Sequence, residues 1–419
     1  MSKILSKRAQ KIVSKPNILL SGISKVLLNP YSENNLKGII NLGTAENKLN
    51  NKEILEKINE AHGKCVDKHL CYGSFSGSEK TRSNIARLLN RYLKPRDEIK
   101  ASQIFVGNGC GPMVDMMGTV LCDEGEAFIV PEPYYGGFNS DLSTRASIDV
   151  VPVGHLKDDV LGITEEMLEE VYEKNKEKVK GIIISNPNNP FGRTYTTEQL
   201  LVFINFCHKH KLHFISDEIY ALSQFRDSFD GKKANFVSVT SLDLPDPSRV
   251  HVLYGLSKDF CMNGFRIGVI MSRSLPIIAA LKSYSMFCCI PGSYDTMLEN
   301  LLDNDEWIDY FVSLNQKRLA ENYKKITKSL KEHNIKYVDA NSAYFMWIDL
   351  REQIKKVISN YDESPADAEM KFWNRLLNNG VYIAPSAAFY ATEPGFFRIC
   401  FATQWDILSE ALERIYKSI

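Results

Sequence analysis

The chain has 419 residues, which is longer than a typical single domain, so a large domain together with a smaller one is expected. Hydrophobic residues make up 44% and charged residues 24% of the sequence, an ordinary composition for a globular protein with a sizeable core. The 51 basic residues balance the 51 acidic ones, so neither a basic nucleic-acid-binding surface nor an acidic disordered tail is indicated. A function in small-molecule chemistry is therefore the default expectation.

Residues 1–20 are basic and mildly amphipathic, but they lack the continuous apolar stretch and small-residue cleavage site of a secretory signal. They contain no acidic residue, so an organellar presequence is the alternative to the cytoplasmic location that we expect. No apolar run reaches the roughly 18 residues that a membrane span needs. The nine cysteines form no Cys-x-x-Cys pattern, which predicts reduced thiols and neither a disulfide framework nor a metal site.

The N-terminal stretch to about residue 50 is predicted to be rich in loops, and residues 52–65 are predicted to form a helix. Seven apolar runs rich in Val, Ile and Phe then follow, separated by helical stretches. Nearly continuous apolar runs of this length are typical of strands buried on both faces of a mostly parallel sheet. The runs are 103–107, 126–131, 148–153, 180–185, 212–216, 249–256 and 266–272. An α/β large domain over residues 61–305 is therefore expected.

The series of strand-length apolar runs separated by helical stretches ends at about Met286. Residues 308–334 keep an apolar residue every three or four positions, which predicts a long amphipathic helix. The remainder mixes the expected strands 343–350 and 396–402 with a helix over 370–380. These elements indicate a smaller α+β domain over residues 306–419, completed by part of residues 1–60.

Ligands of open α/β sheets bind at the carboxyl ends of the strands, so the residues after each run are the candidates for a site. They comprise a glycine-rich turn for an anion, an aromatic plate, an amide, a carboxylate, a phenol, an amine and a guanidinium. In chain order these are Gly109 and Cys110, Tyr134 and Tyr135, Asn189, Asp217, Tyr220, Lys258 and Arg266.

Each candidate has an ordinary explanation when it is taken alone. A glycine-rich turn is often only a turn, an acid at a strand end often caps a helix, and paired tyrosines often only pack in a core. Arg266 and Arg398 could each form a surface or interdomain ion pair. The complete set, in this order at strand ends, is what favours a binding site.

Three motifs carry a resemblance to the fold-type I aminotransferases: GLSKDFCMNGFRIG, NPNNPFG and SDEIY. Three further segments resemble the 1-aminocyclopropane-1-carboxylate synthase branch of that family: NPYSENNLKGIINLGTAENKL, PEPYYGGF and ATEPGFFRICFA. The matches run from Asn29 to Ala402. The segment LDLPDPSRVHV also resembles the animal synthase-like proteins.

The resemblance implies pyridoxal 5'-phosphate as cofactor and gives each candidate a role. Lys258 would form a Schiff base with the cofactor aldehyde and, once freed, move the substrate α-proton. Asp217 would pair with the pyridine nitrogen, and Tyr135 would stack on the ring. Asn189 and Tyr220 would bond the phenolic oxygen of the ring.

The resemblance also implies two anion sites. Arg266, with the backbone amides of Gly109 and Cys110, would hold the phosphate, and Ser257 would contact the cofactor beside the lysine. Arg398 would bind the substrate α-carboxylate through two parallel hydrogen bonds, and Asn189 would also contact the substrate.

The sequence departs from the plant synthases at three positions. Gly255 stands where many relatives have a phosphate-binding serine, and Ser140 replaces an arginine. Phe75 replaces a tyrosine whose hydroxyl reaches the cofactor across a dimer interface, although Tyr72 lies nearby in the sequence. Glu46 agrees with the synthases, since it lies in the segment that enters their substrate site and could attract a sulfonium substrate.

We therefore expect a cytoplasmic, homodimeric pyridoxal-phosphate enzyme that acts on an α-amino acid, most simply as a transaminase or Cβ-lyase. The arm and helix at 1–60 would contribute to the dimer contacts. A true 1-aminocyclopropane-1-carboxylate synthase, which splits methylthioadenosine from S-adenosylmethionine, is the alternative. A non-catalytic regulatory homologue is a remote third reading. Neither a nucleic acid nor a membrane is expected as a partner.

Overall fold

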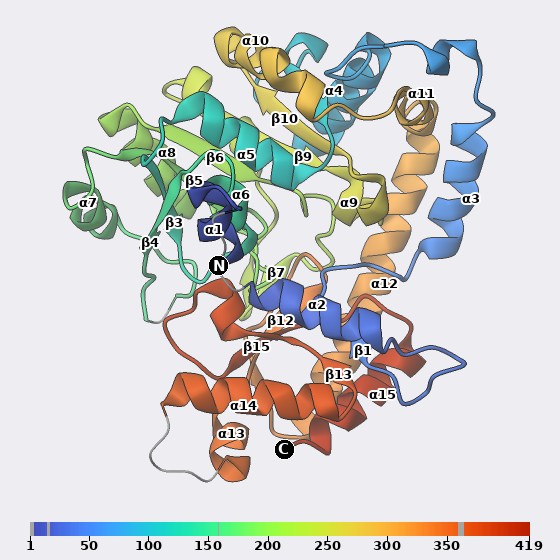
Figure 1. Ribbon diagram of the computed structural model, residues 1–419, viewed down its shortest axis with the longest axis vertical. Coiled ribbons are helices and arrows are strands. Elements are labelled where there is room, and N and C mark those ends of the chain that lie inside the picture. Colours follow the sequence, from blue (N-terminus) through green and yellow to red (C-terminus); the bar gives the residue numbers. More distant parts are fainter. Residues whose placement is uncertain (1–3, 15–16, 158, 359–363) are drawn as a thin grey trace.

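A seven-stranded sheet, the large sheet, organises the upper part of the molecule (Figure 1). The structure, a computed structural model, describes residues 4–14, 17–157, 159–358 and 364–419. The strand order is β2-β10-β9-β6-β5-β3-β4. The strands are β2 (Ile104–Gly107), β3 (Ala127–Pro131), β4 (Asp149–Val153), β5 (Val179–Ser185), β6 (His213–Asp217), β9 (Val250–Gly255) and β10 (Gly268–Ser272). They coincide with the seven predicted runs, so the expected α/β fold is confirmed.

Six of the seven strands run in the same direction. Strand β10 is antiparallel to both of its neighbours, β2 and β9, whereas all the other neighbouring strands pair in parallel. The carboxyl ends of the six parallel strands therefore meet at one edge of the sheet. That edge is where polar groups from distant parts of the sequence can converge.

Helices cover both faces of the large sheet because alternate side chains of its buried strands point to opposite faces. In β5, for example, Ile182 and Ile184 belong to one apolar cluster and Ile183 to the other. Helices α5 (Cys110–Leu121), α6 (Gly137–Ser143) and α10 (Leu275–Tyr284) pack on the face of Ile183. The opposite face carries α3 (Asn51–His62), α4 (Glu79–Leu93), α7 (Glu165–Glu173), α8 (Thr197–His210) and α11 (Gly292–Leu301).

Hydroxyl side chains fix where several of these helices begin. Ser78, Thr164 and Thr196 precede α4, α7 and α8, and each accepts a hydrogen bond from the backbone N–H three residues later. Such a bond satisfies one of the amide groups that the first turn of a helix leaves without a partner.

A four-stranded antiparallel sheet, the small sheet, forms the lower part of the molecule (Figure 1). Its order is β11-β12-β15-β14, and α13 (Arg351–Val357), α14 (Pro365–Asn378) and α15 (Trp405–Tyr416) lie around it. The strands are β11 (Lys336–Tyr337), β12 (Phe345–Asp349), β14 (Ala384–Pro385) and β15 (Phe396–Cys400). The N-terminal part joins it, since β1 (Ile40–Asn41) pairs in parallel with β13 (Val381–Tyr382).

Helix α12 (Asp305–Glu332) runs along both parts of the molecule (Figure 1). Near its start, Ile308 and Phe311 pack in the core of the large sheet, and further on Leu319 and Ile326 pack in the core of the small sheet. The predicted long helix is therefore present. The predicted domain bounds at residues 60 and 305 stay a prediction, because one helix serves both cores.

The expectation of a loop-rich N-terminal stretch is wrong for two segments, α1 (Lys7–Val13) and α2 (Ile18–Leu28). Helix α2 begins where the Asn17 side chain accepts a hydrogen bond from the Leu20 N–H. Gly22, which lowers helix propensity in the sequence, has a packing role, since a Cβ there would lie 2.4 Å from the Tyr382 ring. The glycine lets α2 lie directly on Tyr382.

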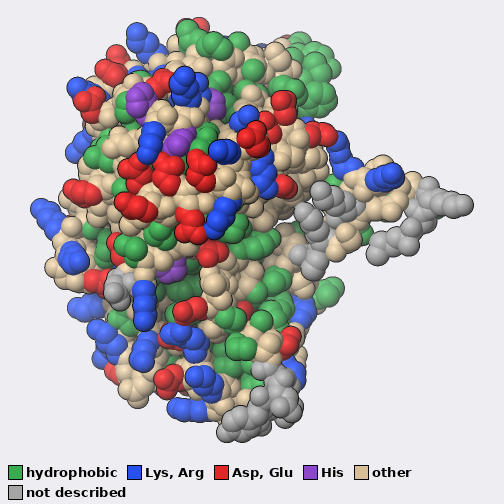
Figure 2. All heavy atoms as spheres, turned by 90° about the vertical axis from the view of Figure 1, so that its left-hand side faces the viewer, with side chains coloured by type: hydrophobic (Ala, Val, Ile, Leu, Met, Phe, Trp, Pro, Cys, Tyr) green, Lys and Arg blue, Asp and Glu red, His purple; other side chains and the backbone are tan. Residues whose placement is uncertain are grey.

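Figure 2 shows the face that carries α7 and α8, where acidic and basic side chains lie among one another. Lys209, for example, pairs with both Glu165 and Glu169. This mixing agrees with the zero net charge of the chain. In the part of the chain that the structure describes, no helix combines the length and the apolar character that crossing a bilayer requires.

Candidate active site

A cavity of about 440 Å³ lies at the edge where the parallel strands end. It is closed by the large sheet on one side and by α2 and residues from the small sheet on the other. Most of the predicted site residues line it: Cys110, Tyr135, Asn189, Asp217, Tyr220, Ser257, Lys258, Arg266 and Arg398. Gly109 lies directly behind Arg266. Glu46 and Tyr134 lie outside this lining, and the Tyr134 ring stacks on that of Tyr390.

Lys258 belongs to α9 (Leu256–Asp259), a short helix that follows β9 directly. Its Nζ donates a hydrogen bond of 2.7 Å to the carbonyl oxygen of Ala45. Burial, followed by the positive charge of Arg398, lowers the pKa of Lys258 to about 8. A substantial fraction of this amine is therefore neutral near physiological pH.

The Ala45 carbonyl is a shared acceptor at the centre of the cavity. Besides Lys258, the side chain of Asn263 and the hydroxyl of Tyr344 each donate to it, both at 3.1 Å. Three donors on one carbonyl fix the position of the lysine amine relative to both the large and the small sheet.

Asp217 ends strand β6 and is buried. Its Oδ1 accepts a hydrogen bond of 3.3 Å from the backbone N–H of Ile219. Burial raises the pKa of Asp217 to about 7, although the nearby Lys258 opposes the rise. A carboxylate held in such surroundings is strongly favoured to pair with a cationic N–H group.

Arg398 reaches the cavity from β15 of the small sheet and is only 3% exposed. Its Nη1 donates to Asn189 Oδ1 at 2.9 Å, and its Nη2 donates to the Gly43 carbonyl at 2.5 Å. The guanidinium lies 4.9 Å from the ring centre of Phe345 and 4.8 Å from that of Phe389. Its Nε is buried and finds no hydrogen-bond partner in the described residues.

An anion site is built where α5 begins. Gly109 precedes the helix with φ +108, and no side chain caps the first turn. A Cβ at Gly109 would lie 2.5 Å from Arg266 Nη2, so only glycine lets this guanidinium approach the helix N-terminus so closely. Backbone amides of a first helical turn beside a guanidinium make a strong site for a phosphate-sized anion.

The tyrosines of the site are held by ring contacts. Tyr135 packs edge-on against Phe138, and a Cβ on Gly137 would lie 2.2 Å from its ring, so this glycine makes room for the tyrosine. Tyr220 contacts Tyr344 and Phe345 edge-on. Burial raises the pKa of Tyr220 well above its usual value, which keeps its hydroxyl protonated and able to donate.

Two residues that line the cavity, Asn263 and Asp141, and one behind it, Tyr344, were not predicted from the sequence. Tyr344 lies in an expected apolar strand together with other aromatic residues, so it did not stand out. Asn263 lies between Lys258 and Arg266 and matches no motif residue with a known role. Asp141 lines the cavity from α6, and burial raises its pKa to about 6. Only the fold brings these side chains to the site, since each comes from a different segment of the chain.

The family described as aminotransferase class I and II matches residues 37–415 of the chain. A human protein called probable inactive 1-aminocyclopropane-1-carboxylate synthase-like protein 2 is 33% identical over 92% of this chain and 68% of its own length. 1-Aminocyclopropane-1-carboxylate synthase 2 of Cucurbita pepo is 31% identical over 93% of this chain and 80% of its own length.

The chain belongs to the class I and II aminotransferase family. The relatives put it in the 1-aminocyclopropane-1-carboxylate synthase-like branch, so the expected family and cofactor class are confirmed: it is a pyridoxal-phosphate-dependent enzyme that acts on an amino acid. An aspartate aminotransferase of Thermus thermophilus, with maleate, has the same fold, with a TM-score of 0.82 and 22% identity over the whole of both chains.

The departures from the synthase pattern have distinct structural settings. Tyr72 is almost fully exposed and its ring lies 5.9 Å from that of Phe75; neither residue lines the cavity. Ser140 lines the cavity, and its hydroxyl donates to the Gly137 carbonyl. Glu46 is partly exposed and lies 3.7 Å from Lys48.

Gly255 is explained by its neighbour Cys110. A Cβ at position 255 would lie 2.8 Å from the Cys110 sulfur and 2.8 Å from the Ile267 carbonyl oxygen. The thiol, which donates to the Tyr254 carbonyl, fills the space that a side chain at 255 would occupy. In this member of the family the glycine and the cysteine are therefore complementary.

Restoring the common serine should reveal this complementarity. We expect Gly255→Ser to lower the melting temperature, because overpacking a filled core costs about 1–3 kcal/mol. Adding Cys110→Ala should recover part of the loss, since it removes one of the two close contacts. Cys110→Ala alone is the control in thermal unfolding. A Gly255→Ser protein as stable as the wild type would contradict the explanation.

Proposed function

We propose that pyridoxal phosphate binds in the cavity around Lys258 and that the α-carboxylate of an amino acid substrate binds to Arg398. The observation that carries the proposal is the Arg398 guanidinium, a buried cation between two aromatic rings with an unused Nε–H. Such a group is unfavourable unless an anion completes its hydrogen bonds. The carboxylate is the anion that every α-amino acid carries.

The chemistry of the cavity fits the polar parts of the cofactor. The phosphate would bind the amides of Gly109 and Cys110 together with Arg266, and Ser257 adds a hydroxyl nearby. Asp217 would hold a proton on the pyridine nitrogen. A cation beside Asp217 would favour its charged form and offset the burial that now raises its pKa.

Three uncharged side chains would orient the ring. Asn189 and Tyr220 would donate hydrogen bonds to the phenolic oxygen, and Tyr135 would stack on one face of the ring. Once bound, the cofactor supplies an electron sink that stabilises negative charge at the substrate α-carbon. The protein's part is to hold both molecules and to move the α-proton.

Lys258 would carry the cofactor covalently and, when released, remove the α-proton. Its lowered pKa of about 8 supports both tasks, because each needs a neutral amine. Arg398, the second cause of that lowering, would thus serve both carboxylate binding and the reactivity of the lysine.

Transamination or Cβ-lyase chemistry is the proposed reaction. Both begin with transfer of the α-proton to Lys258 and differ only in what happens next. The side chain of the substrate would meet Leu19, Leu20 and Ile23 of α2, an uncharged wall. A neighbouring cavity of about 620 Å³ shares Leu19 and Leu20, so a large uncharged side chain could be accommodated.

A true 1-aminocyclopropane-1-carboxylate synthase is the second candidate, and Glu46 is the observation that favours it. This carboxylate is near enough to raise the pKa of Lys258 slightly, and it could attract a sulfonium group. The relative from Cucurbita pepo carries that name. The apolar wall on α2 keeps this candidate second.

The non-catalytic reading has support from the name of the human relative. Against it, the present chain keeps Lys258, Asp217 and Arg398 in one cavity, with the lysine pKa lowered toward neutrality. We therefore propose an active enzyme.

We also propose a homodimer in the cytoplasm. Large apolar side chains are exposed around one end of α2 and around η1 (Asp67–Leu70), among them Leu27, Leu28, Leu70 and Tyr72. Exposed apolar groups of this kind are usual at subunit contacts. All nine cysteines are unpaired, which agrees with a reducing compartment.

Arg398→Lys tests the carboxylate site. We expect kcat/KM for the best amino acid substrate to fall about 10- to 100-fold, the loss expected when a charge-assisted hydrogen bond disappears, while the cofactor absorbance is kept. Steady-state kinetics and absorbance spectra measure the two effects. Arg351→Lys, at an exposed ion pair of the small sheet, is the matched control. Normal turnover in Arg398→Lys would sink the assignment.

The lowered pKa of Lys258 predicts the pH dependence of cofactor capture. Protein freed of its cofactor should bind pyridoxal phosphate covalently faster as pH rises, because the amine must lose its proton. The half-maximal rate should fall near pH 8 and not near the 10.4 or so of an exposed lysine. Stopped-flow absorbance measures the rate. A rate that still climbs steeply above pH 9 would contradict the prediction.

Product analysis with S-adenosylmethionine separates the two candidate reactions. The proposed function predicts no aminocyclopropanecarboxylate or methylthioadenosine, but turnover of at least one amino acid with a large uncharged side chain. If both products form, vanish in Lys258→Ala and decline in Glu46→Gln, the synthase becomes the first candidate. Mass spectrometry of the reaction mixture gives the answer.

A further inference from the structure

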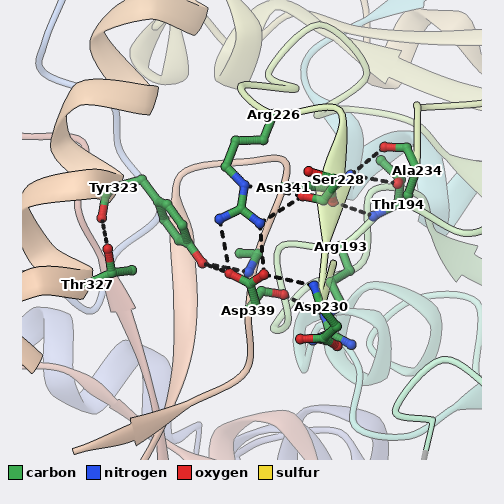
Figure 3. A network of polar contacts seen from close by, with 11 residues as sticks. Arg193, Thr194, Arg226, Ser228, Asp230, Ala234, Tyr323, Thr327, Asp339 and Asn341 are labelled. Atoms are coloured by element: carbon green, nitrogen blue, oxygen red, sulfur yellow. Dashed lines mark hydrogen bonds and ion pairs between the residues drawn. The ribbon is translucent and has the colours of Figure 1, made fainter. Parts of the chain in front are cut away.

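A polar network lies outside the cavity, where four segments of the chain meet (Figure 3). The segments are the loop at 186–194 after β5, residues 225–234 around the hairpin of β7 (Ser228–Phe229) and β8 (Lys232–Lys233), helix α12, which carries Tyr323, and residues 339–342 before β12. We call five side chains of this network the Asp339 clamp: Arg193, Arg226, Tyr323, Asp339 and Asn341.

Asp339 is the centre of the clamp. Its carboxylate accepts hydrogen bonds from Arg226 at 3.1 and 2.8 Å, from the Tyr323 hydroxyl at 2.5 Å and from the Asp230 backbone N–H at 2.9 Å. Burial opposes its ionisation, but the bonds from Arg226 and Tyr323 outweigh burial and hold the pKa of Asp339 below its usual value. The carboxylate is therefore ionised and fully bonded.

Arg193 ties the loop at 186–194 to the same point. Its Nε donates to the Asp339 carbonyl at 2.6 Å, its Nη2 pairs with Asp230 at 2.5 Å, and its guanidinium lies 4.6 Å from the ring centre of Phe229. The side chain is buried, which is rare for arginine without such partners.

Asn341 links three of these segments through its side chain and is fully buried. Its side chain accepts from the Thr194 N–H at 3.1 Å and donates to the Thr194 hydroxyl at 3.0 Å and to the Ala234 carbonyl at 2.9 Å. Each hydrogen bond crosses from one segment to another, so the three segments are fixed together.

The backbone continues this contact toward the cavity. Gly192, with φ +69, has its carbonyl bonded to the N–H groups of Asn341 and Ser342. A Cβ at Gly192 would lie 2.6 Å from the Phe345 carbonyl. The loop therefore lies flat on the segment that leads into β12.

Both sides of the clamp lead into the candidate active site. The loop at 186–194 carries Asn189, which accepts a hydrogen bond from Arg398. The segment after Asn341 carries Tyr344, whose hydroxyl donates to the Ala45 carbonyl that Lys258 also contacts. No member of the clamp lines the cavity itself.

We propose that Asp339 is a positioning residue for the substrate carboxylate. Its carboxylate holds residues 225–234 through Arg226 and the Asp230 N–H, and the Asp230 side chain in turn pairs with Arg193 of the loop at 186–194. Through these residues Asp339 holds the loop, fixes Asn189 opposite Arg398 and so sets the direction of the guanidinium. The inference rests on the proposed role of Arg398 as the carboxylate-binding group. Asp339 acts through Asn189 and does not touch the substrate.

Two cofactor-reactive probes measure this effect without knowledge of the natural substrate. Aminooxyacetate carries a carboxylate, and methoxyamine has the same reactive group without it. The ratio of their rates of reaction with the cofactor-loaded protein, followed by the loss of the cofactor absorbance, reports carboxylate binding alone. A merely destabilising change would alter both rates together and leave the ratio unchanged.

We expect Asp339→Asn to lower this ratio about tenfold, the effect of weakening one charge-assisted hydrogen bond to a carboxylate. Asn keeps the size of the side chain but cannot accept both bonds from Arg226. Tyr323→Phe, which removes only the bridging hydroxyl, should lower the ratio less, and it decides the question if Asp339→Asn does not fold. Asp305→Asn is the matched control, because this carboxylate also accepts two hydrogen bonds from arginine side chains but contacts no site residue.

An unchanged ratio in the folded Asp339 and Tyr323 variants would overturn the inference. A wild-type protein that reacts no faster with aminooxyacetate than with methoxyamine would instead contradict the proposed role of Arg398. The two failures are therefore distinguishable. Arg398→Lys provides the reference for a lost carboxylate preference.

Discussion

Lys258 and Arg398, two of the three cationic side chains that line the cavity, are near enough for the charge of Arg398 to lower the pKa of Lys258, and the site around them supplies the acceptors that both need. Bringing like charges together away from water is unfavourable. The pKa of Lys258 is lowered as a result, so that its amine loses its proton more easily. The arginine cannot lose its proton, so it needs acceptors: Asn189 and the Gly43 carbonyl provide them. The Ala45 carbonyl does the same for the lysine.

This arrangement requires both sheets. Lys258 follows a strand of the large sheet, Arg398 lies within the small sheet, and the acceptors Gly43 and Ala45 come from the N-terminal segment that joins the small sheet. Helix α12 and the Asp339 clamp connect the two parts away from the cavity. Because the charges must meet across a boundary, the contacts that fix this boundary influence the chemistry without touching a reactant.

The parts of this picture that could be predicted from the sequence are those with a local signal. The seven apolar runs identified the large sheet, because strands buried on both faces need continuous apolar sequence. The residues just after these runs included most of the cavity lining, since parallel strands end at one edge. Lys258 and Asp217 were found in this way, and the motif resemblance added Arg398, which belongs to no strand of the large sheet.

Residues without a local signal escaped prediction. Helix α2 was not predicted, and Gly22 lowers the helix propensity of its sequence. This glycine allows the close approach of α2 to Tyr382. Tyr344 lies in an expected strand like several other aromatic residues, and Asp339 belongs to no motif. Their contacts join segments far apart in the sequence, and a single sequence contains no record of such pairs.

Borohydride reduction of the cofactor-loaded protein, followed by peptide mapping, tests the central claim most directly, because it fixes the cofactor to whichever amine carries it. We expect the reduced cofactor on the peptide that contains Lys258, and no labelled peptide from Lys258→Ala. Label on another lysine, or label that persists in Lys258→Ala, would contradict the role of Lys258 as the cofactor-binding amine.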